Sequence, residues 1–284
     1  MRLRALTAAA AAATLALTFT ACSPSQSGGS GDGGGEGGGD SVRIGIKFDQ
    51  PGLGFRAGNA DPEGFDVEVA KYVANELGYS EDQIEWVQTP SANRENALEN
   101  GEVDMIFATY SITDERKERV SFAGPYFVAG QDLLVRADEN EIQGPEDLDG
   151  RNLCSVTGST SAQQLRDEYA PGANLVEQGG YAECVTILES GQVDAVSTDD
   201  IILAGLAATE ANAGKYKVVG NPFTDERYGV GLPPDSDQCQ AINDAITKMR
   251  DEGAWQEALD TSLEGADFEP NAERNDNIEL ETCA

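Results

Sequence analysis

Short blocks of hydrophobic and polar residues alternate along most of the chain with the periods of strands and helices. Residues 42–48 alternate with period two, which predicts a strand, and Phe65, Val69, Val73 and Leu77 then recur on one face of a helix. Further strands are expected at residues 84–87, 103–108, 132–136, 152–156, 193–196, 216–219 and 228–232, and helices at residues 94–100, 181–190 and 199–209 and near Thr113, Glu146 and Thr160. This order is typical of α/β architecture with mostly parallel sheets.

Two stretches of the chain are similar enough to indicate that one unit is built twice. Residues 99–104 read ENGEVD and residues 189–194 read ESGQVD, and aligning them places Thr109 opposite Asp199. Each of these residues follows a short apolar strand. Ligands of open α/β sheets bind beyond the carboxyl ends of strands, so Thr109 and Asp199 are candidates for contact with a ligand.

The segment after the second unit looks like a return to the first. A strand at residues 228–232 is followed by an amphipathic helix and then by Trp255 and Leu259. We therefore expect one lobe from residues 41–131 and 227–284, and a second lobe from residues 132–226. The two crossovers, near residues 129–134 and 224–230, would form a hinge.

The N-terminus has the features of an export signal. Arg2 and Arg4 precede an apolar run at residues 5–19, which is shorter than the ~20 residues that a membrane-spanning helix needs. We expect a signal peptide at residues 1–21 and a flexible, Gly-rich tether at residues 22–40.

The end of that signal resembles the cleavage site of bacterial lipoproteins. The resemblance makes Cys22 the lipidated first residue of the mature chain, although Phe19 stands where such signals carry an aliphatic residue. Ordinary secretion, with Cys22 free or removed, is the alternative. We expect an exported protein, held by a lipid to the outer face of the cell membrane.

Composition limits the partners that the protein can have. Nineteen basic and fifty-one acidic residues give a net charge of -32, which repels nucleic acid and anionic lipid. About 244 residues follow the tether, enough for one large domain or two modest ones. A basic residue near a ligand site stands out against this background.

Four cysteines remain after Cys22, and an exported chain permits disulfides. They allow three pairings. If each lobe holds one pair, local pairing leaves the lobes free to move, so we expect Cys154–Cys184 and Cys239–Cys283. The sequence has no histidine and no C-x-x-C motif, which argues against a zinc site and excludes Ser-His-Asp and Cys-His catalysis. We expect no metal and no cofactor.

Three motifs carry a specific resemblance. Residues 65–70 (FDVEVA), 110–116 (YSITDER) and 122–126 (FAGPY) resemble the polar amino-acid branch of the extracytoplasmic solute-binding proteins of ABC importers. The similarity covers residues 41–263. Residues 45–52 and the cysteines at 154 and 184 are most similar to glutamate-binding lipoproteins. The resemblance implies a two-lobed periplasmic-binding-protein (Venus flytrap) fold, in which helices flank a mostly parallel sheet in each lobe and two strands form the hinge.

The charges of a free amino acid require complementary groups in the protein. A carboxylate binds a bidentate guanidinium and backbone N–H groups, and the resemblance makes Arg116 this clamp, with Thr109 and Ser111 beside it. The alternative is a surface arginine paired with Asp114 or Glu115.

The ammonium requires a carboxylate, and the resemblance assigns it to Asp199. Capping of the following helix is the alternative role of Asp199. From the second lobe, Thr160 and the amide of Ser159 would bind the ligand's carboxylate as the lobes close.

Specificity is expected to come from Ser91, Arg94 and Lys47. Ser91 and Arg94 match positions that contact an acidic side chain in related binders, and Lys47 stands where binders of cationic amino acids carry an aspartate. We therefore expect glutamate as the ligand, with aspartate next. Phe48 would stack against it, and packing at the end of its strand is the alternative role of this side chain.

The resemblance implies lobe closure around the ligand and delivery to an ABC permease with its ATPase. We expect a monomer and no enzymatic activity. The alternatives are a binder of glutamine or another polar amino acid, and a dehydratase-type enzyme on the same fold.

Overall fold

The computed structural model describes residues 41–283. The expected signal peptide, the tether and Cys22 lie outside the described residues. Within residues 41–283, no helix combines the length and the apolar character that a membrane crossing requires.

The first lobe is built on a five-stranded sheet with the order β4-β1-β5-β12-β6. β1 is parallel to β4 and β5, whereas β12 is antiparallel to β5 and β6. Only β12 therefore runs against the others in this sheet. The strands are β1 (Val42–Ile46), β4 (Ile84–Gln88), β5 (Met105–Phe107), β6 (Ser121–Ala129) and β12 (Glu226–Leu232).

The second lobe repeats this plan with the strand order β11-β7-β10-β8-β9. β8 is parallel to β9 and β10, and β7 is antiparallel to β10 and β11. In each sheet the single reversed strand is the one that enters from the other lobe. The strands are β7 (Gln131–Arg136), β8 (Asn152–Val156), β9 (Asn174–Gln178), β10 (Ala195–Asp199) and β11 (Tyr216–Val218).

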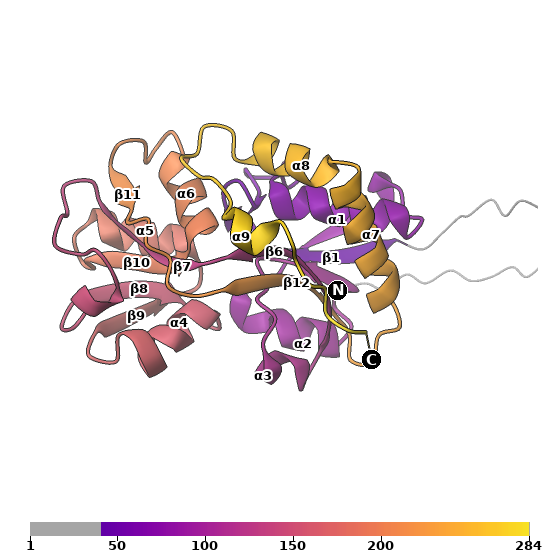
Figure 1. Cartoon of the computed structure of the whole chain (residues 1–284), viewed down its shortest axis with the longest axis horizontal. Helices are drawn as coiled ribbons and strands as arrows, with labels where there is room; N and C mark the ends of the chain where they lie inside the picture. Colours follow the sequence, from indigo (N-terminus) through magenta and orange to yellow (C-terminus); the bar gives the residue numbers. More distant parts are fainter. Residues whose placement is uncertain (1–40, 284) are drawn as a thin grey trace, which may run out of the picture. The chain divides into compact units, whose positions relative to one another are not determined.

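Helices flank both sheets (Figure 1). Those of the first lobe are α1 (Phe65–Glu76), α2 (Arg94–Glu99), α3 (Asp114–Lys117), α7 (Cys239–Asp251), α8 (Ala254–Ser262) and α9 (Ala272–Asn275). Those of the second lobe are α4 (Thr160–Gln164), α5 (Tyr181–Glu189) and α6 (Asp200–Ala208). A short hairpin, β2 (Asp49–Gln50) and β3 (Gly54–Phe55), follows β1. The two-lobed α/β fold is confirmed.

The C-terminal helices return to the first lobe and close its aromatic core. Trp255 of α8 meets Phe65 of α1 edge to face and stacks on Phe127 of β6. Its indole N–H donates to the Tyr126 carbonyl at 2.8 Å. Burial of each such side chain contributes about 1.5–3 kcal/mol, so the chain beyond residue 232 is part of the first lobe's core.

The chain passes between the lobes twice. The first crossover is Gly130, between β6 and β7, and the second is residues 219–225, between β11 and β12. The expected boundaries at 131/132 and 226/227 each fall one residue away from the change of sheet, because Gln131 pairs within the second sheet and Glu226 within the first.

Both expected disulfides are present, and each lies within one lobe. Cys154 of β8 is bonded to Cys184 of α5, and Cys239 of α7 to Cys283 near the C-terminus. Closing loops of this length contributes about 4 kcal/mol each in the chain-entropy model. Neither bond restrains the movement of one lobe against the other.

Several element predictions differ from the structure in detail. The strand expected at residues 193–196 is Ala195–Asp199, so Asp199 ends the strand and does not begin the helix. The element near Glu146 is a single 3₁₀ turn, Pro145–Asp147. β6 was missed, because its Gly124–Pro125 pair resembles a turn signal, although the strand continues through it.

Candidate functional site

The turn after β5 is held by a buried carboxylate. Thr109 has a positive φ of 45°, and its N–H donates to Asp66 at 2.9 Å. Asp66 begins α1 and also accepts from the Tyr126 hydroxyl at 2.8 Å. Burial raises the pKa of Asp66 to about 6. The Thr109 N–H is therefore occupied. The Thr109 carbonyl oxygen accepts from the Arg94 guanidinium at 3.3 Å, and its second lone pair suits a further donor such as an ammonium better than a carboxylate.

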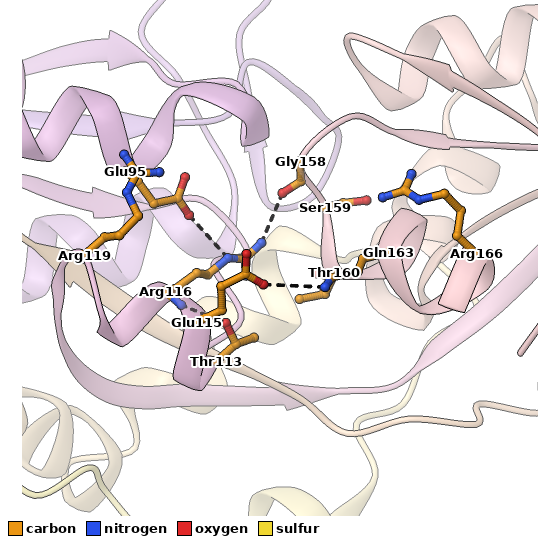
Figure 2. Close-up of a pocket in the computed structure, with 10 residues that line it drawn as sticks. All are labelled: Glu95, Thr113, Glu115, Arg116, Arg119, Gly158, Ser159, Thr160, Gln163 and Arg166. Carbon is orange, nitrogen blue, oxygen red and sulfur yellow. Dashed lines mark hydrogen bonds and ion pairs between the residues drawn. The ribbon is translucent and has the colours of Figure 1, made fainter. Parts of the chain in front are cut away.

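Arg116 is placed by the cap of α3. The Thr113 hydroxyl accepts from the Arg116 N–H at 3.2 Å, which starts the helix and turns the arginine side chain inward. Its guanidinium donates to the Ser111 carbonyl at 2.6 Å and to the Gly158 carbonyl at 3.1 Å, and lies 3.4 Å from Glu95 (Figure 2). The surface-arginine alternative is wrong, because Arg116 is buried and its carboxylate partner is Glu95. Burial lowers the pKa of Arg116 to about 10.

Arg94, at the start of α2, is a second buried guanidinium. It donates to the Ala108 carbonyl at 2.9 Å and lies over the Tyr110 ring, 4.1 Å from its centre. A weaker bond of 3.5 Å reaches the Gly158 carbonyl of the second lobe. Its Nε atom is buried and has no hydrogen-bond partner in the described part of the chain.

Lys47 is a third buried cation, two residues from the start of the β2–β3 hairpin. Its ammonium donates to the Ser91 hydroxyl at 2.8 Å, and the residue is 2% exposed. Burial lowers the pKa of Lys47 to about 8, and the charge of Arg94 contributes to the shift. Among residues 41–283, neither Lys47 nor Arg94 forms an ion pair.

Asp199 ends β10 on the opposite side of the site. Its carboxylate accepts from the Tyr228 hydroxyl at 2.5 Å and from the Ser161 hydroxyl at 3.5 Å. Asp199 is the N-cap residue of α6, as the alternative role has it, but its side chain forms no capping hydrogen bond. Burial raises the pKa of Asp199 well above its usual value, and the negative charge of Glu226 adds to this effect.

The second lobe contributes the start of α4. Ser159 caps this helix by accepting from the Ala162 N–H at 3.0 Å. The Thr160 hydroxyl donates to Glu226 at 2.8 Å and lies 3.4 Å from the Ser111 hydroxyl. The Thr160 hydroxyl proton is thus already donated to Glu226. The main-chain N–H of Thr160 can still donate to a carboxylate, because the first N–H groups of a helix have no partner within the helix.

The structure brings most of the expected residues together. Six of them line one narrow cavity: Ser91, Arg94, Thr109, Ser159, Thr160 and Asp199. Ser161, Tyr181 and Ile202 complete its lining. Ser111 reaches this cavity through its contact with Thr160. Arg116 lines an adjoining cavity that shares Ser159 and Thr160 with it. Lys47 and Phe48 line a neighbouring cavity. The Arg56 guanidinium lies over the Phe48 ring, 5.0 Å from its centre.

Sequence reasoning missed four polar residues of the site. Asp66 lies in the FDVEVA motif and Glu95 follows Arg94 directly, so their positions gave a usable signal. Glu226 and Tyr228 gave none, because they reach Thr160 and Asp199 from strand β12, far away in the sequence. Within the described residues, no group of histidine, cysteine and acidic side chains is arranged to hold a metal ion.

Comparison with known proteins agrees with this architecture. Residues 42–264 match the family model of bacterial extracellular solute-binding proteins, family 3. The chain belongs to this family. It is therefore a solute-binding protein and not an enzyme.

Individual relatives cover most of the chain. The glutamate-binding protein GluB of Corynebacterium efficiens is 47% identical over 234 residues, which are 78% of this chain and 79% of that protein. The glutamine-binding protein GlnH of Bacillus subtilis is 39% identical over 221 residues, covering 77% and 79% of the two chains. A solved structure of an ancestral arginine-binding protein bound to glutamine superposes with a TM-score of 0.71 at 32% identity, and covers 78% of this chain and 97% of that one.

Replacement of Lys47 tests whether the site stores unfavourable electrostatic energy. Lys47→Met removes a buried charge and keeps most of the side-chain volume. Because the lowered pKa of Lys47 means that the fold disfavours the charged form, we expect the free energy of unfolding at pH 7 to rise by about 1–3 kcal/mol. Chemical denaturation measures it. Lys215→Met, at an exposed position paired with Glu189, is the control and should change stability by less than about 0.5 kcal/mol. A destabilised Lys47→Met protein would show that the ammonium is well compensated.

Proposed function

We propose that the protein captures an acidic amino acid outside the cell, with glutamate preferred over aspartate, and presents it to an ABC permease and its ATPase. The observation that carries this proposal is the pair of buried cations, Lys47 and Arg94, that lack a carboxylate partner within residues 41–283. Buried charges in proteins are normally paired, and an anionic side chain of the ligand would supply the missing partner.

The remaining charges of the ligand have their own partners. Arg116 would bind the α-carboxylate together with the Thr160 N–H, and Ser111 would add its hydroxyl. Asp199 and the Thr109 carbonyl would accept hydrogen bonds from the ammonium. Lys47, Arg94 and Ser91 would hold the side-chain carboxylate, with Ser159 and Phe48 at the margins of the site.

The Gly158 carbonyl indicates where a carboxylate would sit. It accepts from Arg116 at 3.1 Å and from Arg94 at 3.5 Å, so one oxygen atom of the second lobe lies between two guanidinium groups of the first. A ligand carboxylate offers those donors a full negative charge in place of a carbonyl dipole, and charge-assisted bonds are about twice as strong. Binding would thus replace a direct contact between the lobes with a contact through the ligand.

The relatives support the class of ligand. GluB and GlnH are named as binders of glutamate and glutamine, and the glutamate binder shares more residues with this chain than the glutamine binder does. The solved structure named above is an ancestral arginine-binding protein bound to glutamine. Anchoring through Cys22 and the 22–40 tether would keep the protein beside its permease.

A thermal-shift screen of the twenty amino acids tests the proposal. Ligand binding stabilises the native state by mass action, so glutamate should give the largest rise in melting temperature and aspartate a smaller one. Lys47→Ala and Arg94→Ala should weaken glutamate binding by about tenfold or more, because a lost charged hydrogen bond costs about 1.5–3 kcal/mol. They should weaken glutamine binding less. Equal losses for both ligands would contradict the side-chain assignment, and a response to cationic amino acids alone would contradict the acidic class.

The pH dependence of binding separates glutamate from glutamine. Lys47 attracts the glutamate side chain only while its ammonium is charged. Because the pKa of Lys47 in the free protein is about 8, this charge is lost as the pH rises through that value. The affinity for glutamate relative to glutamine should therefore be constant near pH 6–7 and fall above about pH 8, by up to about tenfold per unit. Titration of Asp199 affects both ligands alike and cancels in the ratio, and the fraction of each free ligand that carries a charged ammonium is corrected for separately. Calorimetry between about pH 6.5 and 9.5 measures it, and Lys47→Met should abolish the slope. A flat ratio in the unmodified protein would remove Lys47 from the side-chain site.

Closure can be tested at Gly158. Its φ is +79°, and a Cβ placed there would lie 2.7 Å from the Cα of Ala92 in the first lobe. Gly158→Ala should therefore hold the lobes apart and weaken ligand binding by about tenfold or more. Gly191→Ala is the matched control, since Gly191 has a φ of +73° and open space around it. Both variants share the backbone strain, so only the contact with the other lobe distinguishes them. Equal affinities of the two variants would contradict the closure mechanism.

A further inference from the structure

The C-terminal segment, residues 264–283, lies almost entirely beyond the part of the chain that matches the family, which ends at residue 264. It is nevertheless well attached. Asn275 is 2% exposed, and its amide both accepts from the N–H and donates to the carbonyl of Val128, each at 2.9 Å. This side chain thereby occupies main-chain groups of the edge strand β6, and Cys283 fastens the end of the segment to α7 through its disulfide. We call residues 264–283 the tail.

Arg274 of the tail touches both crossovers between the lobes. Its Nε lies 2.7 Å from a carboxylate oxygen of Asp225, in the second crossover. Its Nη1 lies beside Gly130, the whole of the first crossover, because a Cβ built on Gly130 would overlap it. This Nη1 is buried and has no hydrogen-bond partner among residues 41–283. The Cβ of Pro222, from the second crossover, lies 2.7 Å from the same Cβ position on Gly130. One guanidinium thus joins the two connections about which the lobes move.

The tail and the ligand cleft lie on opposite faces of these crossovers. Successive residues of an extended chain point to opposite sides. Gly130 faces Arg274, whereas Gln131 donates to the Ser161 carbonyl at 3.2 Å on the cleft side. In the same way Asp225 pairs with Arg274, whereas Glu226 accepts from Thr160. Figure 1 shows α9 beside β6, on the path of the tail across the hinge.

We propose that the tail is a strap on the outer face of the hinge that favours the arrangement in which the lobes touch, and so raises the affinity of the cleft for its ligand. The proposal rests on the proposed function, in which lobe closure accompanies binding. The contacts of Arg274 with both crossovers coexist in this structure with the direct bonds from Arg94 and Arg116 to Gly158. Contacts made in only one of two states shift the equilibrium toward that state by their free energy.

A cavity between the tail and the second lobe provides the space into which the lobes can move when they open. It is lined by Asp267 and Phe268 of the tail, by Ala204 and Ala208 of α6, and by Tyr216 of β11. A rotation about the crossovers that separates the cleft faces brings the outer faces together. Opening therefore compresses this cavity, and a bulky side chain placed in it should oppose opening.

Arg274→Ala tests the strap. We expect the dissociation constant for glutamate to rise about two- to fivefold. This is the change expected when the loss of one partly exposed ion pair lowers the population of closed molecules. The distance between labels on the two lobes should lengthen in the ligand-free protein. Arg151→Ala is the matched control, because Arg151 and Glu141 form an ion pair of the same 2.7 Å length, with similar exposure, wholly inside the second lobe. It should alter neither quantity.

A second pair of variants predicts the opposite change. Ala208→Trp should lower the dissociation constant and shorten the distance between the lobes, whereas Ala211→Trp, exposed beyond the end of α6 and outside the cavity, should do neither. Equal effects of Arg274→Ala and Arg151→Ala, or weaker binding by Ala208→Trp, would overturn the proposal. If the unmodified protein binds no amino acid, the proposed function fails, and the ligand-free distances still decide whether the tail controls the hinge.

Discussion

Three cations lie buried where the two lobes meet, and the energetics of the cleft depend on how incompletely they are compensated. Removing a charge from water costs several kcal/mol unless a counter-charge or a full set of hydrogen bonds replaces the solvent. Arg116 has Glu95 and two carbonyl groups, Arg94 has carbonyl groups and an aromatic face, and Lys47 has one hydroxyl. The ligand-free fold therefore contains unfavourable electrostatic energy that an anion can relieve. Under the proposed function, affinity and lobe closure would arise from this same interaction.

The surrounding protein makes local compensation necessary. With a net charge of -32, the long-range field opposes the approach of an anion. Salt screens this field over about 8–10 Å, whereas buried pairs are screened much less. Attraction for an anionic side chain must consequently come from groups inside the cleft. Asp199 and Glu226 also lie at the site, where their carboxylates accept hydrogen bonds from the hydroxyl groups of Tyr228 and Thr160.

The parts of the molecule that local patterns encode could be predicted from the sequence. Period-two and helical patterns located β1, α1 and the two duplicated units, and the repeat placed Thr109 and Asp199 at corresponding strand ends. Local cysteine pairing followed from the division into lobes. β6 was missed because its Gly-Pro pair has the local chemistry of a turn, and only the pairing with β12 makes it a strand. Glu226 and Tyr228 were missed because their partners lie 66 and 29 residues away, across the hinge. Local residue patterns carry no signal for such contacts.

The crossovers connect the two kinds of control that this fold offers. On one face, Gln131 and Glu226 bind the parts of the second lobe that line the cleft. On the other face, Gly130 and Asp225 meet Arg274 of the tail. Under the proposed function, groups in the cleft would distinguish one ligand from another, because they would contact its charges directly. Groups on the outer face contact no ligand and can change only the balance between open and closed arrangements, which alters the affinity for every ligand by the same factor. If the tail acts as proposed, changes in its sequence would adjust the affinity while the residues that contact the ligand stay unchanged.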